Sequence, residues 1–70
     1  MLNAVEKEIA CRLAQGETLE LIGLALGCHT NTVNNHIARM KKRFKDEDGQ
    51  PMKTQVQLVV HLTEKGLLDE

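Results

Sequence analysis

The chain has 70 residues, of which 41% are hydrophobic and 1% aromatic, and its formal net charge is −1. This length predicts one domain, residues 1–70, with a marginal core, because short chains bury a low fraction of their surface. Single-stranded nucleic-acid binding by base stacking is not expected, since it needs several aromatic side chains and Phe44 is the sole phenylalanine, tyrosine or tryptophan.

The first predicted helix runs from about Asn3 to Gln15. Asn3 and Glu6 form an asparagine variant of the capping box, in which each side chain satisfies a free backbone amide at the helix start. Gly16 is expected to end the helix in the left-handed conformation. Apolar residues at four-residue spacing predict the core stripe, which is Val5, Ile9 and Leu13.

A second predicted helix begins at a Thr18 cap and ends at Gly27. Gly23 lowers helix propensity inside it, so we expect this glycine to serve close packing against a neighbouring helix. The inward side chains are predicted to be Leu19, Ile22 and Leu26.

The third predicted helix begins with a hydroxyl cap at Thr30, after the Gly27 turn, and runs to Phe44 or Lys45. Its apolar stripe is Val33, Ile37, Met40 and Phe44, at offsets of four, three and four. The opposite, outward face then carries Asn31, Asn34, Asn35, Ala38 and Lys42. A short helix, a tight turn and a second helix predict a helix-turn-helix.

Charge is divided unevenly along the chain. Residues 1–29 carry a net −2, residues 30–45 a net +5 with no acid, and residues 46–70 a net −4. The positive field therefore lies in the third helix, where a local basic footprint favours nucleic acid. The major groove of DNA admits one α-helix between two rows of phosphates. The alternative is a basic helix face that is merely solvated.

The acids, glycine and proline of Asp46 to Pro51 predict an exposed loop, followed by a helix from about Met52 to Lys65 that stops at Gly66. This last helix is apolar on two sides, and so small a core can bury only part of that apolar surface. One side has Leu58 and Leu62, with Leu67 and Leu68 nearby. The other is predicted to be a homodimer face, Val56, Val59, Val60 and Thr63. The alternative is a wide core stripe.

The residue types on the third helix suit DNA chemistry. Asparagine offers an acceptor and donors that match the N7 and N6 edge of adenine, and Asn34 and Asn35 are best placed for base edges. Asn31 is expected to reach a base or a phosphate, and Arg39 likewise. Thr30 and Thr32 are expected to donate to phosphates, with capping the alternative for Thr30. Flanking phosphates are assigned to the remaining cations, Lys41, Lys42, Arg43 and Lys45.

Metal binding and catalysis have little support. His29, His36 and Cys28 lack the second pair of ligands that a zinc site needs, so no metal or other cofactor is expected. His36 is placed near the helix junction or a phosphate, and His61 on the surface. The chain has no phosphate-binding glycine loop and no convincing nucleophile with a base, so it is not expected to be an enzyme.

The two cysteines, Cys11 and Cys28, fit no disulfide framework and are predicted to be reduced and buried. We see no targeting segment, and the apolar run from Leu21 to Cys28 is too short to cross a bilayer. The expected location is the cytoplasm.

Several motifs together resemble the LuxR-type (GerE or FixJ-type) helix-turn-helix domain. They are Leu2, Glu6 and Glu8, Leu13-Ala14-Gln15-Gly16, Ile22, Leu26, Gly27, Asn31 to Ile37, and Lys53-Thr54-Gln55. The resemblance implies an all-α, four-helix bundle that dimerises through its last helix and reads two DNA half-sites with its third. It places DNA contacts on Thr32, Asn34, Asn35, Ala38 and nearby basic residues.

Four features depart from that family. Asn34 stands where lysine or arginine is common, Val5 where arginine is frequent, and Ala38 cannot hydrogen-bond a base. The loop from Lys45 to Met52 is longer than usual, which is expected to alter dimer geometry.

The leading hypothesis is a homodimeric, sequence-specific transcription regulator that binds double-stranded DNA, with no small-molecule ligand and no membrane. The alternative is a protein-interaction module that pairs through its last helix with a larger LuxR-type regulator and inhibits it. A weaker third reading is a sigma-factor-like promoter module. Because Met1 directly precedes the motif, we expect a natural small protein of a bacterium or phage rather than an excised fragment.

Overall fold

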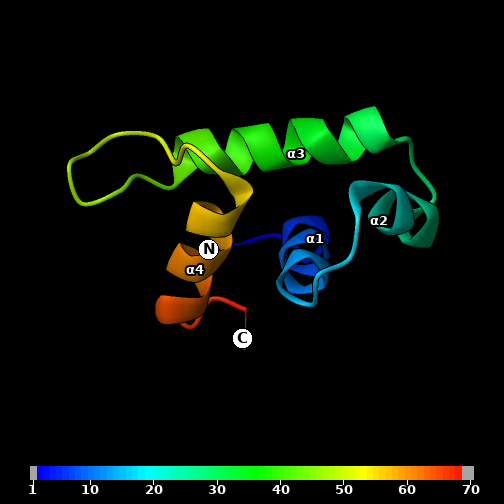
Figure 1. Cartoon of the computed structure of the whole chain (residues 1–70), viewed down its shortest axis with the longest axis horizontal. Coiled ribbons are helices and arrows are strands. Elements are labelled where there is room, and N and C mark those ends of the chain that lie inside the picture. The colour runs from blue at the N-terminus through cyan, green and yellow to red at the C-terminus, as the bar shows by residue number, and fades with distance from the viewer. Residues whose placement is uncertain (1, 69–70) are drawn as a thin grey trace.

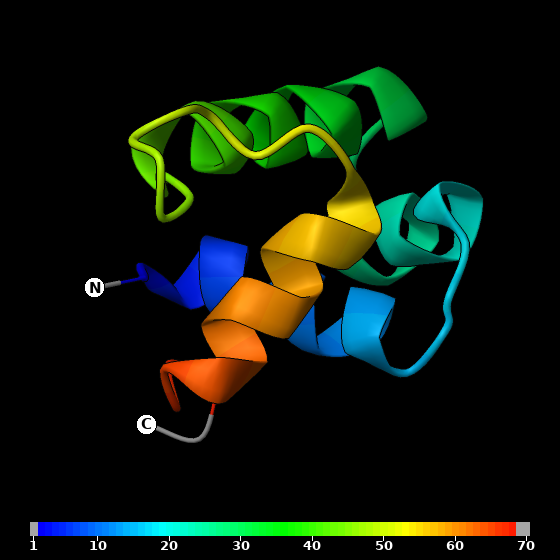
Figure 2. The same ribbon diagram turned by 60° about the vertical axis from the view of Figure 1, so that its left-hand side comes forward.

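The computed structural model describes residues 2–68, and its regular elements there are four helices. They are α1 (Ala4–Ala14), α2 (Leu19–Leu26), α3 (Thr30–Arg43) and α4 (Gln55–Glu64). α3 lies along one side of the molecule and the other three helices lie on the side below it (Figure 1), an arrangement that the turned view repeats (Figure 2). The predicted all-α, four-helix fold is confirmed.

The core gathers side chains from all four helices against the inner face of α3. Prediction and structure agree on the stripe of α3 and on the inner leucines of α4, Leu58 and Leu62, which are fully buried. The buried apolar residues are Ile9, Ala10, Ile22, Val33, Ile37, Met40, Met52, Leu58 and Leu62. The side chains of Leu13, Leu19, Leu26 and Phe44 are partly buried against this core.

The start of α1 has the predicted capping box but not the predicted stripe. The Asn3 side chain accepts from the Glu6 N–H at 2.8 Å, and Glu6 Oε1 accepts from the Asn3 N–H at 3.0 Å. Val5, which we expected in the core, is 44% exposed, and Glu6 is buried instead. The expectation for Val5 was wrong because the buried Ile9 and Ala10 place Glu6 at the centre of the inward face of α1 and Val5 at its edge.

The helix-turn-helix consists of α2, the turn at Gly27 to His29, and α3. Thr18 caps α2 through its side chain, and Gly27 ends it in the left-handed conformation with φ 72°, both as predicted. Gly23 serves a close approach of backbone, which is tightest to the turn before α3 and reaches Thr30, the first residue of α3, at van der Waals distance. A Cβ there would lie 2.7 Å from the Cys28 carbonyl oxygen, within the turn itself. The turn can fold back on α2 because Gly23 has no side chain.

α3 is capped by a different residue from the one predicted. His29 has extended backbone dihedrals, and its Nδ1 accepts a hydrogen bond from the Asn31 N–H at 3.1 Å. Thr30, expected as the hydroxyl cap, is the first residue inside the helix. The hydroxyl is one position too late to cap, since an N-cap residue must be extended.

The predicted loop after α3 is an ordered turn that projects beyond the end of that helix (Figure 1). Asp46 Oδ1 accepts from the Asp48 and Gln50 N–H groups, and the Asp46 N–H donates to the Gln50 carbonyl. Lys45 and Pro51 form an isolated antiparallel bridge at its base. Aspartate side chains commonly accept hydrogen bonds from the backbone two residues on, and here they close the segment into a turn.

α4 begins three residues later than predicted, because Met52 is a core residue in irregular chain and not a helical one. Its N–H donates to the Lys41 carbonyl at 2.8 Å, and its side chain is buried. The true cap is Thr54, which accepts from the Gln57 N–H at 3.0 Å. The end is as predicted, with Gly66 in the left-handed region.

Two smaller expectations need correction. Cys11 and Cys28 are unpaired, as predicted, but each is half-buried rather than buried. His61, expected on the surface, is half-buried, and its ring centroid lies 6.1 Å from that of Phe44. The two rings are tilted by 51° at a distance typical of an aromatic contact.

Candidate nucleic-acid interface

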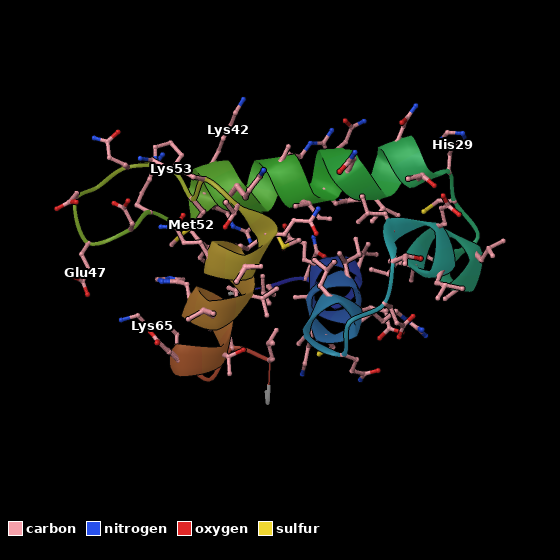
Figure 3. All side chains as sticks on the ribbon, in the orientation of Figure 1. His29, Lys42, Glu47, Met52, Lys53 and Lys65 are labelled. Carbon is pink, nitrogen blue, oxygen red and sulfur yellow. The ribbon has the colours of Figure 1, made fainter. Side chains whose placement is uncertain are left out.

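The outer face of α3 stands free of the rest of the protein. Eight of the ten side chains predicted to contact DNA are exposed: Asn31, Thr32, Asn34, Asn35, Ala38, Arg39, Lys42 and Arg43. Thr30 and Lys41 are half-buried at the edges of this face. Fourteen residues give a helix about 21 Å long at 1.5 Å per residue. Lys42 and His29 project from opposite ends of α3, away from the other helices (Figure 3). We call this surface the outer face of α3.

Apart from Arg43, the polar side chains of this face make no side-chain hydrogen bond or ion pair within residues 2–68. Among the described residues, no side-chain hydrogen bond involves the amides of Asn34 or Asn35. No ion pair of the described residues involves four cations of this segment, which are Arg39, Lys41, Lys42 and Lys45. Their hydrogen-bonding capacity and charge are therefore available to a ligand.

Arg43 has a different environment from the other cations. Its Nη2 donates to Glu6 Oε1 at 2.8 Å, and its guanidinium carbon lies 4.8 Å from the centroid of the Phe44 ring. This ion pair joins the start of α1 to the last turn of α3. Arg43 is 47% exposed in its side chain, so it can hold α3 in place and still face solvent.

Electrostatics favour the charged form of Glu6. Burial alone would raise the pKa of this carboxyl, but hydrogen bonds from Arg43 and the Asn3 N–H, with attraction to Arg43 and His36, lower it below its ordinary value. His36 itself is half-buried on α3.

We expect Glu6→Gln to lower the free energy of unfolding at pH 7 by about 1.5 kcal/mol, since it removes a charged hydrogen bond at a buried site. The folded-state pKa of Glu6 is below its unfolded value. Its stabilisation is therefore present at neutral pH and is lost as the pH falls through the folded-state pKa. Urea denaturation at several pH values measures both effects.

A matched control is Glu8→Gln, which removes the carboxylate of an i,i+4 pair with Arg12 at 2.9 Å. Both side chains of that pair are substantially solvated, so the expected loss is below about 0.5 kcal/mol. Equal losses for the two variants, or a loss at Glu6 that does not shrink in acid, would contradict the role of the Glu6–Arg43 pair.

Lys53 is a basic residue near this face that our residue-by-residue argument missed. The Met52 N–H bond to the Lys41 carbonyl holds the chain beside the last turns of α3, and the next residue is the exposed Lys53. The motif Lys53-Thr54-Gln55 was the available signal, because it belongs to the family resemblance. Its charge adds to the basic end of α3.

The predicted dimer face of α4 is apolar and open to solvent. Val56 is 73% exposed and Val60 48%, Val59 is half-buried, and Thr63 is exposed with its hydroxyl donating to the Val59 carbonyl. A hollow of about 230 Å³ continues this face across to the end of α1. Its lining includes Leu13, Ala14, Glu17, Val56 and Val59.

A second hollow, of about 350 Å³, lies between the turn after α3 and the outer side of α4. Carboxylates line much of it, from Asp46, Glu47, Asp48 and Glu64. Over residues 2–68, no group of three histidine, cysteine or acidic side chains is placed to hold a metal ion. In the same part of the chain, no helix is both long and apolar enough to span a membrane.

Comparison with protein families matches residues 1–50 to the family described as bacterial regulatory proteins, luxR family. Neither curated proteins nor solved structures give a match. The matched segment contains α1, the helix-turn-helix of α2 and α3, and the turn after α3, while α4 lies beyond it. The match covers most of the chain and agrees with the resemblance drawn from the motifs and with the four helices. The chain belongs to the luxR family of bacterial regulatory proteins.

Proposed function

We propose that this protein is a sequence-specific, DNA-binding transcription regulator that acts as a homodimer in the bacterial cytoplasm. In this proposal residues 1–70 form one domain, and α3 of each protomer enters the major groove of one half-site. The observation that carries the proposal is the outer face of α3, where Asn34 and Asn35 make no side-chain hydrogen bond and Arg39 and Lys42 make no ion pair within residues 2–68. Membership of a family of regulatory proteins supports it.

The first turns of α3 are assigned to the bases and to a phosphate at the edge of the groove. Asn34 and Asn35 are exposed, and their amides match the hydrogen-bonding edge of adenine. Asn31 and Thr32 lie one turn earlier, near the free amides and the positive end of the helix dipole, where a phosphate is favoured. Ala38 is exposed on the same face and offers only an apolar contact. Thr30 is assigned to a phosphate at the edge of the groove.

The last turns of α3 are assigned to the phosphate backbone. Lys41, Lys42 and Lys45 carry the charge here with Arg39, and Lys53 is held beside them. Arg43 contributes the part of its guanidinium that Glu6 leaves exposed. Such contacts add affinity and salt dependence but no choice of sequence.

We expect Asn35→Ala to weaken binding to the preferred DNA sequence by about 10- to 100-fold, because a bidentate amide–adenine contact is worth about 1–3 kcal/mol. The preferred sequence is first selected from a random duplex library, and dissociation constants then follow from gel shifts on selected and scrambled duplexes. Binding to the scrambled duplex should change little.

Two further variants make this test specific. Gln50→Ala removes an exposed side-chain amide from the turn after α3. Gln50 takes part in the hydrogen bonds of that turn through its backbone, so this variant should leave both affinities unchanged. Lys42→Ala should weaken binding to both duplexes by the same factor and reduce the dependence of the affinity on salt concentration. Failure of the unaltered protein to select any sequence over bulk DNA would refute the proposal.

A second candidate function rests on the apolar face of α4. The exposed Val56 and Val60 would also suit pairing with a larger luxR-family regulator, which the small protein would then inhibit. If Asn35→Ala abolishes DNA binding but leaves regulation in cells intact, this second function is the correct one.

A further inference from the structure

The residue that caps α3 is a histidine, which is an uncommon choice. N-cap positions favour serine, threonine, aspartate and asparagine, whose oxygens accept from the first free amides of the helix. Here the acceptor is a ring nitrogen: Nδ1 of His29 receives the Asn31 N–H at 3.1 Å. The ring is exposed at the start of the outer face of α3, and Figure 3 shows it projecting from the turn.

Protonation changes what this ring can do. A neutral imidazole has one acceptor nitrogen, and the bond from Asn31 uses it, which leaves the proton on Nε2. A protonated imidazole has two donors and no acceptor, so it cannot cap the helix. Its positive charge would also lie at the positive end of the helix dipole, where cations are disfavoured. The cap therefore exists only while His29 is neutral.

Nothing charged among the described residues offsets this effect. The first turn of α3 has no acid, and the one acid of α2 is Glu20, in the first turn of that helix and away from the Gly27 turn. Glu17, just before α2, is paired with Arg12. No ion pair over residues 2–68 involves His29. The capping bond is thus the contact that couples the charge of His29 to the helix.

We propose that His29 is a positioning residue whose neutral ring fixes the first turn of α3, and whose protonation releases that turn. Asn31 and Thr32 lie in this turn, and Asn34 and Asn35 follow directly. The part that concerns DNA rests on the proposed function: binding weakens as the pH falls through the range of about 5 to 8 in which histidine changes charge. The part that concerns the cap does not depend on DNA.

The cap is tested by NMR on the free protein between pH 8 and pH 5.5. The amide signal of Asn31 should shift along the same titration curve as the ring signals of His29. In His29→Ser, which caps α3 with a hydroxyl that does not titrate, the Asn31 amide should show no such curve. If the Asn31 amide signal of the unaltered protein does not shift as the ring signals of His29 change, the proposal is wrong.

The effect on DNA is tested with the same two proteins. At pH 8 the two proteins should bind the selected duplex with equal affinity. At pH 5.5 the unaltered protein should bind it more weakly than His29→Ser, by about fivefold for each α3 that contacts DNA. Fivefold is the change in an equilibrium constant that corresponds to the stabilisation from a typical N-cap. Because the two proteins differ only at residue 29, the effect of pH on every other group is common to both and drops out of this ratio. A ratio that does not change with pH, or that reverses, overturns the role of His29. Failure of both proteins to select a sequence at pH 8 overturns the proposed function instead, and the NMR result still stands.

Discussion

Gly23→Ala should lower the free energy of unfolding by about 2 kcal/mol and abolish sequence-specific DNA binding. Alanine is the better helix former by about 1 kcal/mol, so propensity alone predicts the opposite sign. The new Cβ, however, would lie 2.7 Å from the Cys28 carbonyl oxygen and 3.6 Å from the Thr30 nitrogen. These are backbone atoms of the turn and of the first residue of α3, and they cannot move aside as a flexible side chain can.

The turn must therefore shift, and α3 shifts with it, because Thr30 is the first residue of that helix. Thermal or urea unfolding measures the stability, and gel shifts on the selected duplex measure the binding. Ala25→Gly exchanges the same two residue types at an exposed position of α2. It should cost about 1 kcal/mol through propensity and leave binding intact. A Gly23→Ala protein that is more stable than the unaltered one would show that the turn is not tightly constrained.

Features set by residues close together in sequence were predictable. Asn3 and Glu6 are three residues apart, and the capping box formed as expected. Thr18 and Gly27 bound α2 for equally local reasons, since a hydroxyl satisfies the first amides and glycine adopts positive φ without strain. The stripe of α3 follows from helical periodicity alone, and all of its members up to Met40 are buried.

Features set by distant partners were not predictable in the same way. Glu6 could be placed in the core only with its partner Arg43, which lies 37 residues further along and satisfies the buried carboxylate. Met52 leaves the helical register because its N–H bonds to the Lys41 carbonyl. The cap of α3 was predicted at Thr30 and not at His29 for another reason. A ring nitrogen can accept a hydrogen bond as an oxygen does, but N-cap preferences rank hydroxyl, carboxylate and amide side chains highest.

The candidate site lies between these cases. Its exposed residues were identified from the period of α3, because whatever opposes a buried stripe on a surface helix faces solvent. The contribution of Arg43 to the fold was invisible in the sequence, since a basic run does not show which cation an acid on another helix will bind. Base and phosphate contacts stay predictions for Asn34, Asn35 and Lys42.

Val56→Glu should leave the folded protomer intact but prevent two copies from binding DNA together. Val56 is 73% exposed, so the fold does not depend on its burial. In a dimer formed through α4 its side chain would be buried, and an unpaired carboxylate in an apolar interface is strongly disfavoured. Glu17 lines the same hollow and would add repulsion between like charges.

The expected result is a monomer by sedimentation and a loss of at least about 100-fold in affinity for DNA with two half-sites, because joining two binding sites raises affinity by about 10²–10⁴. Affinity for a single half-site should hardly change, since the outer face of α3 is untouched. Val5→Glu introduces the same charge at an exposed valine of α1. It should change neither the oligomeric state seen by sedimentation nor the affinity for DNA. If Val56→Glu remains dimeric and keeps its two-site affinity, the copies meet through another surface, because no α4 interface that buries Val56 could accept the charge.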